Sequence, residues 1–292
     1  MSRESRKRSS HAQNFLARPA VARQIIARAE IEPDDLVIEI GAGRGMLTRA
    51  LAGSCRQVLA IEKDGTLARR LAREVRPHGN VALVEGDFLD LPLPLTPYKV
   101  VANIPFNITA AIVARLTQAG NPPEEAVLVV QREAAERFVG QPRQTLAAVL
   151  LQPWFELSIA ARLRQNDFVP PPRVEVVLLR FSKRGPPLVA PEDAQDYRDF
   201  VTYGFTAWKP TLREAYGTVI PPAQQARLAE DIHLDLCRRP SEVDFDRWLA
   251  LFRALRRPAS PTRWRVIAGA EERLRARQEG LIKPHRGRDG GG

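Results

Sequence analysis

Seven short apolar runs between residues 36 and 181 dominate the hydrophobic pattern of the chain. They occupy residues 36–40, 57–62, 81–87, 99–104, 126–131, 155–163 and 175–181. Helical spacing of apolar residues separates the first six runs, which is typical of parallel strands connected by helices. The last two are joined by a short segment around prolines 170–172, which is too short for a crossover helix. We therefore expect an α/β fold with a seven-stranded sheet, whose last strand pairs antiparallel at the sheet edge.

The pattern changes after residues 182–187, Ser-Lys-Arg-Gly-Pro-Pro, whose composition is typical of a linker. Strand-like runs stop there and helical spacing begins. It is found at residues 193–206, 224–232 and 242–255. The sequence thus predicts an α/β domain over residues 11–185 and a small all-α domain over residues 190–268.

The two ends of the chain have the composition of unstructured segments. Residues 1–10 are basic, and we expect them to form a flexible arm. Residues 271–292 end in three glycines, and we expect a disordered tail there.

A glycine-rich segment, Gly-Ala-Gly-Arg-Gly at 41–45, follows the first apolar run and precedes a helical pattern at 46–52. Glycines at a strand-to-helix turn let a ligand approach the backbone closely, at the carboxyl edge of a parallel sheet. The spacing does not match the Gly-x-Gly-x-x-Gly of dinucleotide sites, because Met46 and Leu47 follow Gly45. This mismatch disfavours a pyrophosphate-containing ligand.

Acidic residues end the next two expected strands. Glu62 lies 21 residues after Gly41, where an acidic side chain commonly binds a ribose diol. Asp87 ends the third run, where it could accept a hydrogen bond from an adenine amino group, with Phe88 near the ring. Either acid taken alone could instead be a solvated strand end. Together with the glycines they predict a site for an adenosine-containing ligand.

The fourth run leads into Asn103, Ile104, Pro105 and Phe106. The Asn103 side-chain oxygen and the Ile104 carbonyl can accept the two hydrogens of an exocyclic amine, and Phe106 can stack on a purine. Pro105 restricts the backbone, so the two acceptors need little reorganisation. An ordinary strand-to-turn exit is the alternative, because Asn and Pro both favour turns.

These features resemble the S-adenosylmethionine-dependent methyltransferases, and more narrowly the rRNA adenine dimethyltransferases. Residues 11–16, His-Ala-Gln-Asn-Phe-Leu, are similar to the amino-terminal motif of that family, and residues 168–174, Phe-Val-Pro-Pro-Pro-Arg-Val, to its late motif. Gln13 has no glycine before it, and Asn-Ile-Pro-Phe replaces Asn-Leu-Pro-Tyr. At both motifs the sequence is more similar to the erythromycin-resistance (Erm) branch of the family, which methylates an adenine of 23S rRNA.

The resemblance implies a Rossmann-like methyltransferase sheet, S-adenosyl-L-methionine as cofactor and 23S rRNA as partner. It also implies resistance to macrolide, lincosamide and streptogramin B antibiotics. Small-subunit rRNA or DNA as the target, and an RNA-binding assembly factor without turnover, are the alternatives. The reaction would need no metal ion, because a sulfonium methyl is already electrophilic.

The residues of the family's site are carried over from matching motifs. The cofactor contacts implied are Asn14, Leu16, Gly41, Gly43, Glu62, Lys63, Asp87, Phe88 and Asn103. The implied catalytic positions are Asn103, Ile104, Pro105 and Phe106. The target base would meet Phe106 and Phe168.

The net charge of +10 and the calculated pI of about 10.3 indicate a polyanionic partner. Arginine supplies 38 of the 44 basic residues, which suits RNA, although a GC-rich coding sequence would also favour arginine. Residues 253–265 contain Trp264 and no acid, so we expect Arg256 and Arg257 to contact RNA phosphates. A solvated amphipathic helix would have a similar pattern.

Two cysteines and four histidines are scattered without metal-ligand spacing, so we expect reduced thiols and no metal site. No apolar run approaches the roughly 20 residues that span a bilayer, and no signal-peptide segment follows the charged start. We expect a cytoplasmic monomer.

Overall fold

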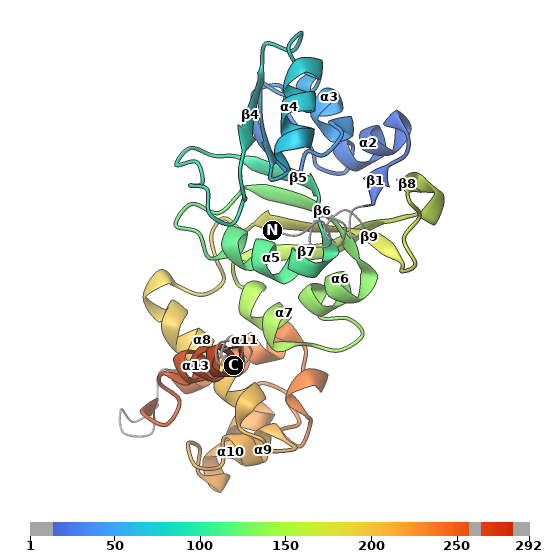
Figure 1. Cartoon of the computed structure of the whole chain (residues 1–292). Helices are drawn as coiled ribbons and strands as arrows, with labels where there is room; N and C mark the ends of the chain where they lie inside the picture. The colour runs from blue at the N-terminus through green and yellow to red at the C-terminus, as the bar shows by residue number, and fades with distance from the viewer. Residues whose placement is uncertain (1–13, 257–263, 283–292) are drawn as a thin grey trace, which may run out of the picture. The chain divides into compact units, whose positions relative to one another are not determined.

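The computed structural model describes residues 14–256 and 264–282, which divide into two units (Figure 1). The first unit takes the described residues up to 139 together with 155–185, and the second takes 140–154 and the residues from 186 onward. The division after Gly185 falls within the linker that the composition indicated. Residues 140–154 group with the second unit, although the sequence pattern placed them in the α/β domain. The arm at 1–10 lies outside the described residues.

The first unit is built on a seven-stranded sheet in the order β4-β3-β2-β5-β6-β9-β7. Its strands are β2 (Leu36–Ile40), β3 (Gln57–Glu62), β4 (Val81–Glu85), β5 (Lys99–Asn103), β6 (Glu125–Gln131), β7 (Phe155–Leu163) and β9 (Val176–Lys183). The strands from β4 to β6 are parallel, and β9 is antiparallel to both β6 and β7. The expected Rossmann-like sheet with an antiparallel last strand is confirmed.

The expected position of that last strand is wrong. Strand β9 lies between β6 and β7, and β7 forms the edge. Residues 176–179 of β9 are all buried, which suits a strand covered on both faces. In β7, Glu156, Ser158 and Arg162 are exposed, and polar side chains of this kind protect a sheet edge from further pairing.

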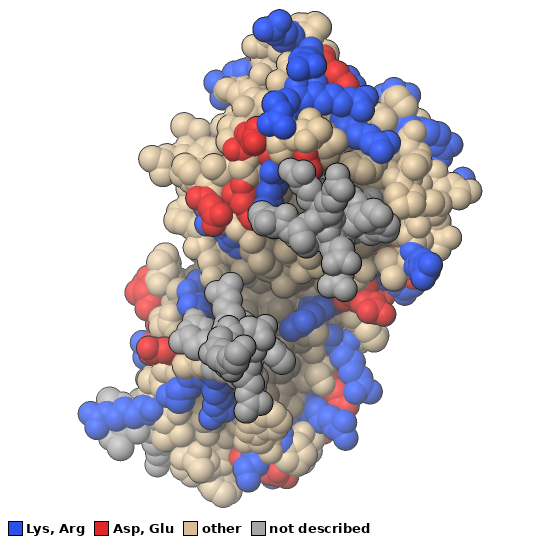
Figure 2. Space-filling model, viewed as in Figure 1, with Lys and Arg blue, Asp and Glu red and all other residues tan. Residues whose placement is uncertain are grey.

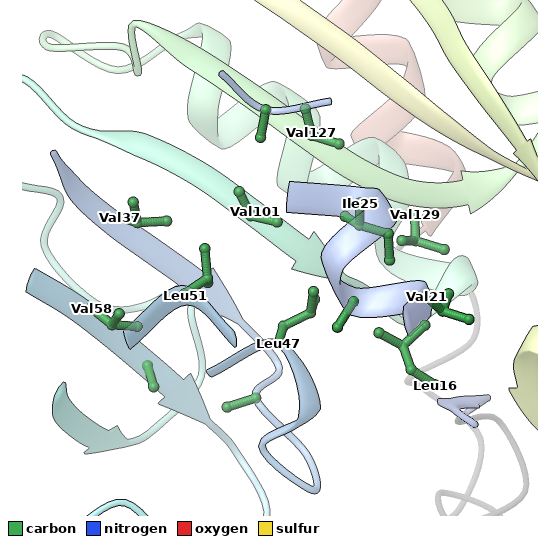
Figure 3. Close-up of a cluster of buried hydrophobic side chains, with 14 of the residues drawn as sticks. Leu16, Val21, Ile25, Val37, Leu47, Leu51, Val58, Val101, Val127 and Val129 are labelled. Atoms are coloured by element: carbon green, nitrogen blue, oxygen red, sulfur yellow. The ribbon is translucent and has the colours of Figure 1, made fainter. Parts of the chain in front are cut away.

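Helices cover both faces of this sheet, as its buried strands require. They are α2 (Pro19–Ile26), α3 (Met46–Ala52), α4 (Gly65–Glu74), α5 (Thr109–Thr117) and α6 (Arg132–Val139). Figure 3 shows Val21 and Ile25 of α2 and Leu47 and Leu51 of α3 packed over apolar side chains of β2, β3, β5 and β6. This core fixes the carboxyl ends of the strands on which the candidate site is built.

A second, two-stranded sheet joins two segments that are far apart in the sequence. Strand β1 (Phe15–Leu16) pairs antiparallel with β8 (Phe168–Val169), and Ala17 N donates to Asp167 O over 2.8 Å. The Arg18 guanidinium pairs with the Asp167 carboxylate at 2.6 Å. The amino-terminal motif and the late motif therefore lie side by side.

The second unit is helical around an aromatic core. Its helices are α7 (Leu146–Leu151), α8 (Ala194–Thr206), α9 (Leu212–Ala215), α10 (Pro222–Asp231), α11 (Phe245–Arg256) and α13 (Ala270–Ile282). The ring of Phe200 contacts the rings of Tyr216, Trp248 and Phe252. Helix α7 belongs here because the Tyr197 hydroxyl donates to Val149 O over 2.8 Å.

Helix α13 contradicts the expected disorder of residues 271–282. Its start is held by Asp199, whose carboxylate accepts from Gly269 N at 2.8 Å and Glu271 N at 2.9 Å. The helix carries charged residues around most of its surface, so no apolar period marks it in the sequence. Residues 283–292 lie outside the described part of the chain. No helix in the described residues is both long and apolar enough to span a membrane.

Candidate active site

The glycine-rich turn lies between β2 and α3 and adopts the left-handed backbone that its sequence allows. Gly41, Gly43 and Gly45 have φ of +73°, +55° and +71°. A Cβ at Gly43 would stand 3.1 Å from the Phe15 ring, and a Cβ at Gly45 would clash with Leu71 at 2.2 Å. Glycine is therefore required both by the backbone and by the space that surrounds the turn.

This turn forms one wall of a cavity at the carboxyl ends of β2 and β5. The side chains and backbone that line the cavity belong to Asn14, Phe15, Leu16, Glu39, Gly41, Ala42, Gly43, Arg44, Met46, Leu47, Asn103, Ile104, Pro105 and Phe106. Eight of these positions were expected from the sequence: Asn14, Leu16, Gly41, Gly43, and residues 103–106. The structure thus brings the amino-terminal motif, the glycine turn and the Asn-Ile-Pro-Phe motif to one place.

Asn103 is held in a defined orientation at the end of β5. Its Nδ2 donates to Asn14 O over 2.8 Å. Because a backbone carbonyl can only accept, this bond assigns the amide nitrogen to Asn14 and leaves Oδ1 as the acceptor for a ligand. The Asn103 oxygen is therefore pre-positioned on the wall of the cavity to accept a hydrogen bond.

Phe106 lies where this cavity adjoins a wider groove. It begins the short 3₁₀ helix Phe106–Ile108, directly after Pro105, whose φ is −60°. The groove is lined by Asn14, Phe106, Asn107, Gln131 and residues 170–174, and so shares Asn14 and Phe106 with the cavity. A planar ring that enters through the groove would meet Phe106 beside Asn103.

Glu62 is buried behind the glycine turn instead of lining the cavity. Its side chain is 2% exposed, and its two oxygens accept from Gly43 N at 2.7 Å and Asp64 N at 2.8 Å. In this arrangement the carboxylate fixes the shape of the turn. A ligand hydroxyl could still use the remaining lone pairs of the same oxygens.

Three further expected contacts do not line the cavity. Lys63 directly follows β3, and Asp87 and Phe88 come just after β4. Lys63 Nζ and Asp87 Oδ2 form an ion pair at 2.6 Å, and their hydrogen bond lowers the pKa of Asp87 and raises that of Lys63. The Phe88 ring is buried, with the Arg115 guanidinium 5.8 Å from its centre.

Glu39 is a cavity residue that the sequence analysis did not single out. It is 1% exposed, and Thr48 Oγ1 donates to its Oε2 over 2.5 Å. Burial, the largest cause, raises the pKa of Glu39 to about 8, and the negative charge of Glu62 adds to this effect. An acidic residue within an otherwise apolar strand could have drawn attention to Glu39 from the sequence alone.

Two expected contact residues are placed elsewhere by the structure. Phe168 is 1% exposed in the core beside Leu16 and lines neither the cavity nor the groove, because alternation along β8 turns Val169 outward instead. The ring of Phe168 is thus buried away from the cavity, and its expected contact with the target base stays a prediction.

Arg256 forms ion pairs with acidic side chains of the helical unit. Its guanidinium pairs with Asp193 at 3.2 Å and with Asp196 at 2.6 Å, and it lies 5.5 Å from the centre of the Trp264 ring. The Arg256 side chain is still 40% exposed, so its expected phosphate contact stays a prediction beside these ion pairs. Arg257 lies outside the described residues.

The residues that line the cavity are suitable for the cofactor that the motifs implied. A Cβ at Gly41 would face Asn103 O at 3.8 Å, so the missing side chain leaves space beside the end of β5. The buried Glu39 carboxyl offers a partner for a ligand ammonium group, and Leu16, Met46 and Leu47 give the cavity apolar walls.

Comparisons with known proteins agree with this chemistry. Residues 4–253 match the family described as ribosomal RNA adenine dimethylase. Ribosomal RNA small subunit methyltransferase A of Prochlorococcus marinus is 35% identical over 268 residues, which are 86% of this chain and 94% of that protein. The rRNA adenine N-6-methyltransferase of Aeromicrobium erythreum is 34% identical over 258 residues, which are 87% of this chain and 75% of that protein.

A solved structure supports the same assignment. The crystal structure of the 23S rRNA methyltransferase ErmE has a TM-score of 0.78 and 30% identity, over 83% of this chain and all of that chain. The chain belongs to the ribosomal RNA adenine dimethylase family and is an S-adenosyl-L-methionine-dependent rRNA adenine methyltransferase.

Proposed function

We propose that the enzyme methylates N6 of an adenine in 23S rRNA and thereby confers resistance to macrolide, lincosamide and streptogramin B antibiotics. The similarity to the 23S rRNA methyltransferase ErmE, which extends over the whole of that chain at a TM-score of 0.78, carries this proposal. The Asn-Ile-Pro-Phe motif and the absence of a glycine before Gln13 support it, because both resemble the Erm branch.

The reaction depends on making a poor nucleophile reactive. The lone pair of the adenine amine is delocalised into the ring, and two hydrogen-bond acceptors at N6 would favour a more tetrahedral nitrogen. Asn103 Oδ1, oriented by the bond from Nδ2 to Asn14 O, would accept one amine hydrogen, and the Ile104 carbonyl would accept the other. Both would interact more strongly with N6 as it gains positive charge in the transition state.

S-adenosyl-L-methionine supplies the electrophilic methyl group when it is bound. Glu39 would receive the ammonium of the cofactor's methionine part, since it is the buried acid on the cavity wall. Gly41 and Gly43 would allow close approach to the backbone, Glu62 would bind the ribose, and Asp87 with Phe88 would bind the adenine. Holding donor and acceptor in line can contribute up to roughly 7–11 kcal/mol.

Phe106 would stack on the target adenine after the base has left its own stack. Rotating a base out of RNA costs a few kcal/mol and costs least for unpaired bases. The groove that adjoins the cavity gives the base a route to Phe106.

Small-subunit rRNA is the second candidate target, because the Prochlorococcus relative that carries that name is 35% identical to this chain. The catalytic motif serves either target, so the nucleic acid must be identified by experiment.

Transfer of labelled methyl groups to isolated 23S and 16S rRNA distinguishes the two candidates. We expect N6-methylated adenine in 23S rRNA and none in 16S rRNA, and a higher inhibitory concentration of erythromycin for cells that express the enzyme. The Asn103→Ala variant at matched expression is the control and should give neither effect. Label in 16S rRNA alone would assign the enzyme to the small subunit.

A further inference from the structure

Trp208 is exposed on the helical unit, unlike the other three tryptophans of the chain. Its side chain is 90% exposed, and the residue lies in the loop between α8 and α9. Trp154, Trp248 and Trp264 each pack against another aromatic ring. A large apolar ring left in water forgoes the free energy of burial, so the folding of this unit does not account for Trp208.

The backbone holds this ring outward in an unusual conformation. Trp208 has a φ of +55°, in the left-handed region that residues other than glycine rarely adopt. The α9 end of its loop is tied to a distant segment, because Leu212 N donates to Arg238 O at 3.1 Å, and its other end continues from the last turn of α8. A strained residue on a braced loop is typical of a functional position, and bracing lowers the entropy lost on binding.

Cationic side chains accompany Trp208. Lys209, Arg213 and Arg238 are exposed, and within the described residues none of them has an ion-pair partner. Backbone bonds from Leu212 N to Arg238 O and from Arg213 N to Leu236 O, the latter at 2.8 Å, bring the segment that carries Arg238 beside the one that carries Arg213. Trp208 and Lys209 thus share one loop, and Arg213 and Arg238 lie on two hydrogen-bonded segments at the α9 end of that loop.

We propose that Trp208, Lys209, Arg213 and Arg238 form a contact for an unpaired nucleotide of RNA. The indole would stack on the base and the cations would contact neighbouring phosphates, the combination by which proteins bind single strands. The inference rests on the proposed function only in that RNA is the substrate, and it adds a binding site on the helical unit. A protein partner would call for a wider apolar patch, whereas Lys209, Arg213 and Arg238 add exposed positive charge to the exposed ring.

Tryptophan fluorescence tests this contact directly, because Trp208 is the strongly exposed member of the four. The probe is an oligoadenylate of about 10 nucleotides, within the range of 4–16 that single-strand-binding domains occupy. The difference between the emission of the full-length enzyme and that of Trp208→Phe isolates the signal of Trp208. We expect the oligoadenylate to quench this difference signal, and a duplex RNA of equal length to quench it much less.

Binding of the same oligoadenylate, measured by anisotropy at fixed salt, gives the energetic test. Trp208→Ala should weaken binding by about 5- to 150-fold, whereas Trp208→Phe, which keeps a stacking face, should retain most of the affinity. The matched control is Leu95→Ala, which removes another highly exposed apolar side chain (94%) and should leave binding unchanged. Circular dichroism of each variant checks folding, and the Trp208→Phe quenching comparison remains decisive if Trp208→Ala does not fold.

Unquenched Trp208 emission at saturating oligoadenylate, or equal affinity of the wild type and Trp208→Ala, would overturn the proposal. Equal losses for Trp208→Ala and Leu95→Ala would overturn it as well. Methylation of 23S rRNA by the wild-type enzyme is measured alongside. Its absence would count against the proposed function, and the quenching result would still decide the role of Trp208.

Discussion

The buried carboxyl of Glu39 is protonated in the fold over a range of pH in which the unfolded chain has released its proton. Its pKa is raised from 4.5 to about 8, chiefly by burial. The folded state therefore binds more protons than the unfolded state between these values, and the contribution of Glu39 to stability falls as pH rises through this window. Below about pH 4.5 that contribution is fully present.

We predict that Glu39→Gln, which mimics the protonated acid, removes this pH dependence. The free energy of unfolding, measured in urea, should increase for the variant relative to the wild type as the pH is raised from about 5 to 8. The relative increase should be at most on the order of 3 kcal/mol. The same variant should bind S-adenosyl-L-methionine more weakly, because glutamine, unlike Glu39, cannot release a proton and become an ionic partner for the ammonium group. A constant stability difference across this pH range would contradict the protonated state of Glu39.

Phe106 and Glu62 have different expected roles, and single substitutions should separate them. Phe106→Ala should lower turnover far more than cofactor affinity, and Phe106→Tyr, which keeps the ring, should retain activity. Glu62→Ala should mainly weaken cofactor binding, because it removes the acceptor that fixes Gly43 N at 2.7 Å. Calorimetry of cofactor binding and single-turnover rates measure the two effects. Equal effects of both variants on both quantities would contradict this division.

At the scale of elements, the start of α3 depends on Gly45 for two separate reasons. Its φ is +71°, and an added Cβ would meet Leu71 at 2.2 Å. Gly45→Ala should lower the free energy of unfolding by at least about 1–2 kcal/mol, measured in urea. Gly53→Ala at the other end of α3 is the matched control, since its φ is −88° and the nearest atom lies at 3.9 Å. A loss of equal size in both variants would show that the close packing at Gly45 is unimportant.

The start of α13 depends on Asp199, which is 4% exposed and accepts from two backbone N–H groups. Asp199→Ala should cost about 1–2 kcal/mol of stability and should speed amide hydrogen exchange over residues 270–282. Asp199→Asn keeps one acceptor oxygen and should have a smaller effect. Unchanged exchange over residues 270–282 in the alanine variant would mean that α13 does not need this cap.

The elements of the fold could be predicted where they depend on local pattern. The seven strands have apolar runs of their own, and Gly-Ala-Gly-Arg-Gly marks a turn whose positive φ values only glycine adopts readily. The order of β7 and β9 could not be predicted, because it depends on which strand is buried on both faces. Helix α13 was missed for a related reason, since its cap, Asp199, is about 70 residues earlier in the chain.

The site could be predicted to a similar degree. The position of Asn103 and Phe106 on the cavity wall could be predicted because they directly follow a strand, whereas Glu39 was overlooked because its burial is a property of the folded cavity. The burial of Phe168 and the ion pairs of Arg256 could not be predicted, because the sequence shows neither the pairing of β1 with β8 nor the aspartates that lie beside Arg256.

At the scale of the whole molecule, the net charge of +10 suits a polyanionic substrate. Figure 2 shows Lys and Arg side chains gathered over the region of α3 and α4. Some of this charge is neutralised internally, because Arg49 and Arg70 both pair with Glu74, at 3.0 and 2.7 Å. RNA affinity should therefore depend on the cations that lack such partners more than on the total number of arginines.

In the reaction that we propose, the Asn103 side-chain oxygen, oriented by Asn14, accepts a hydrogen bond from the adenine amine as the methyl group is transferred. The most direct test is the single-turnover rate of methyl transfer to rRNA at saturating S-adenosyl-L-methionine, for the wild type and Asn103→Ala. We predict that the variant binds rRNA with unchanged affinity and transfers methyl at least about 100-fold more slowly, as expected on losing an electrostatic contact in the transition state. An Asn103→Ala rate equal to that of the wild type would show that the Asn103 oxygen has no part in methyl transfer.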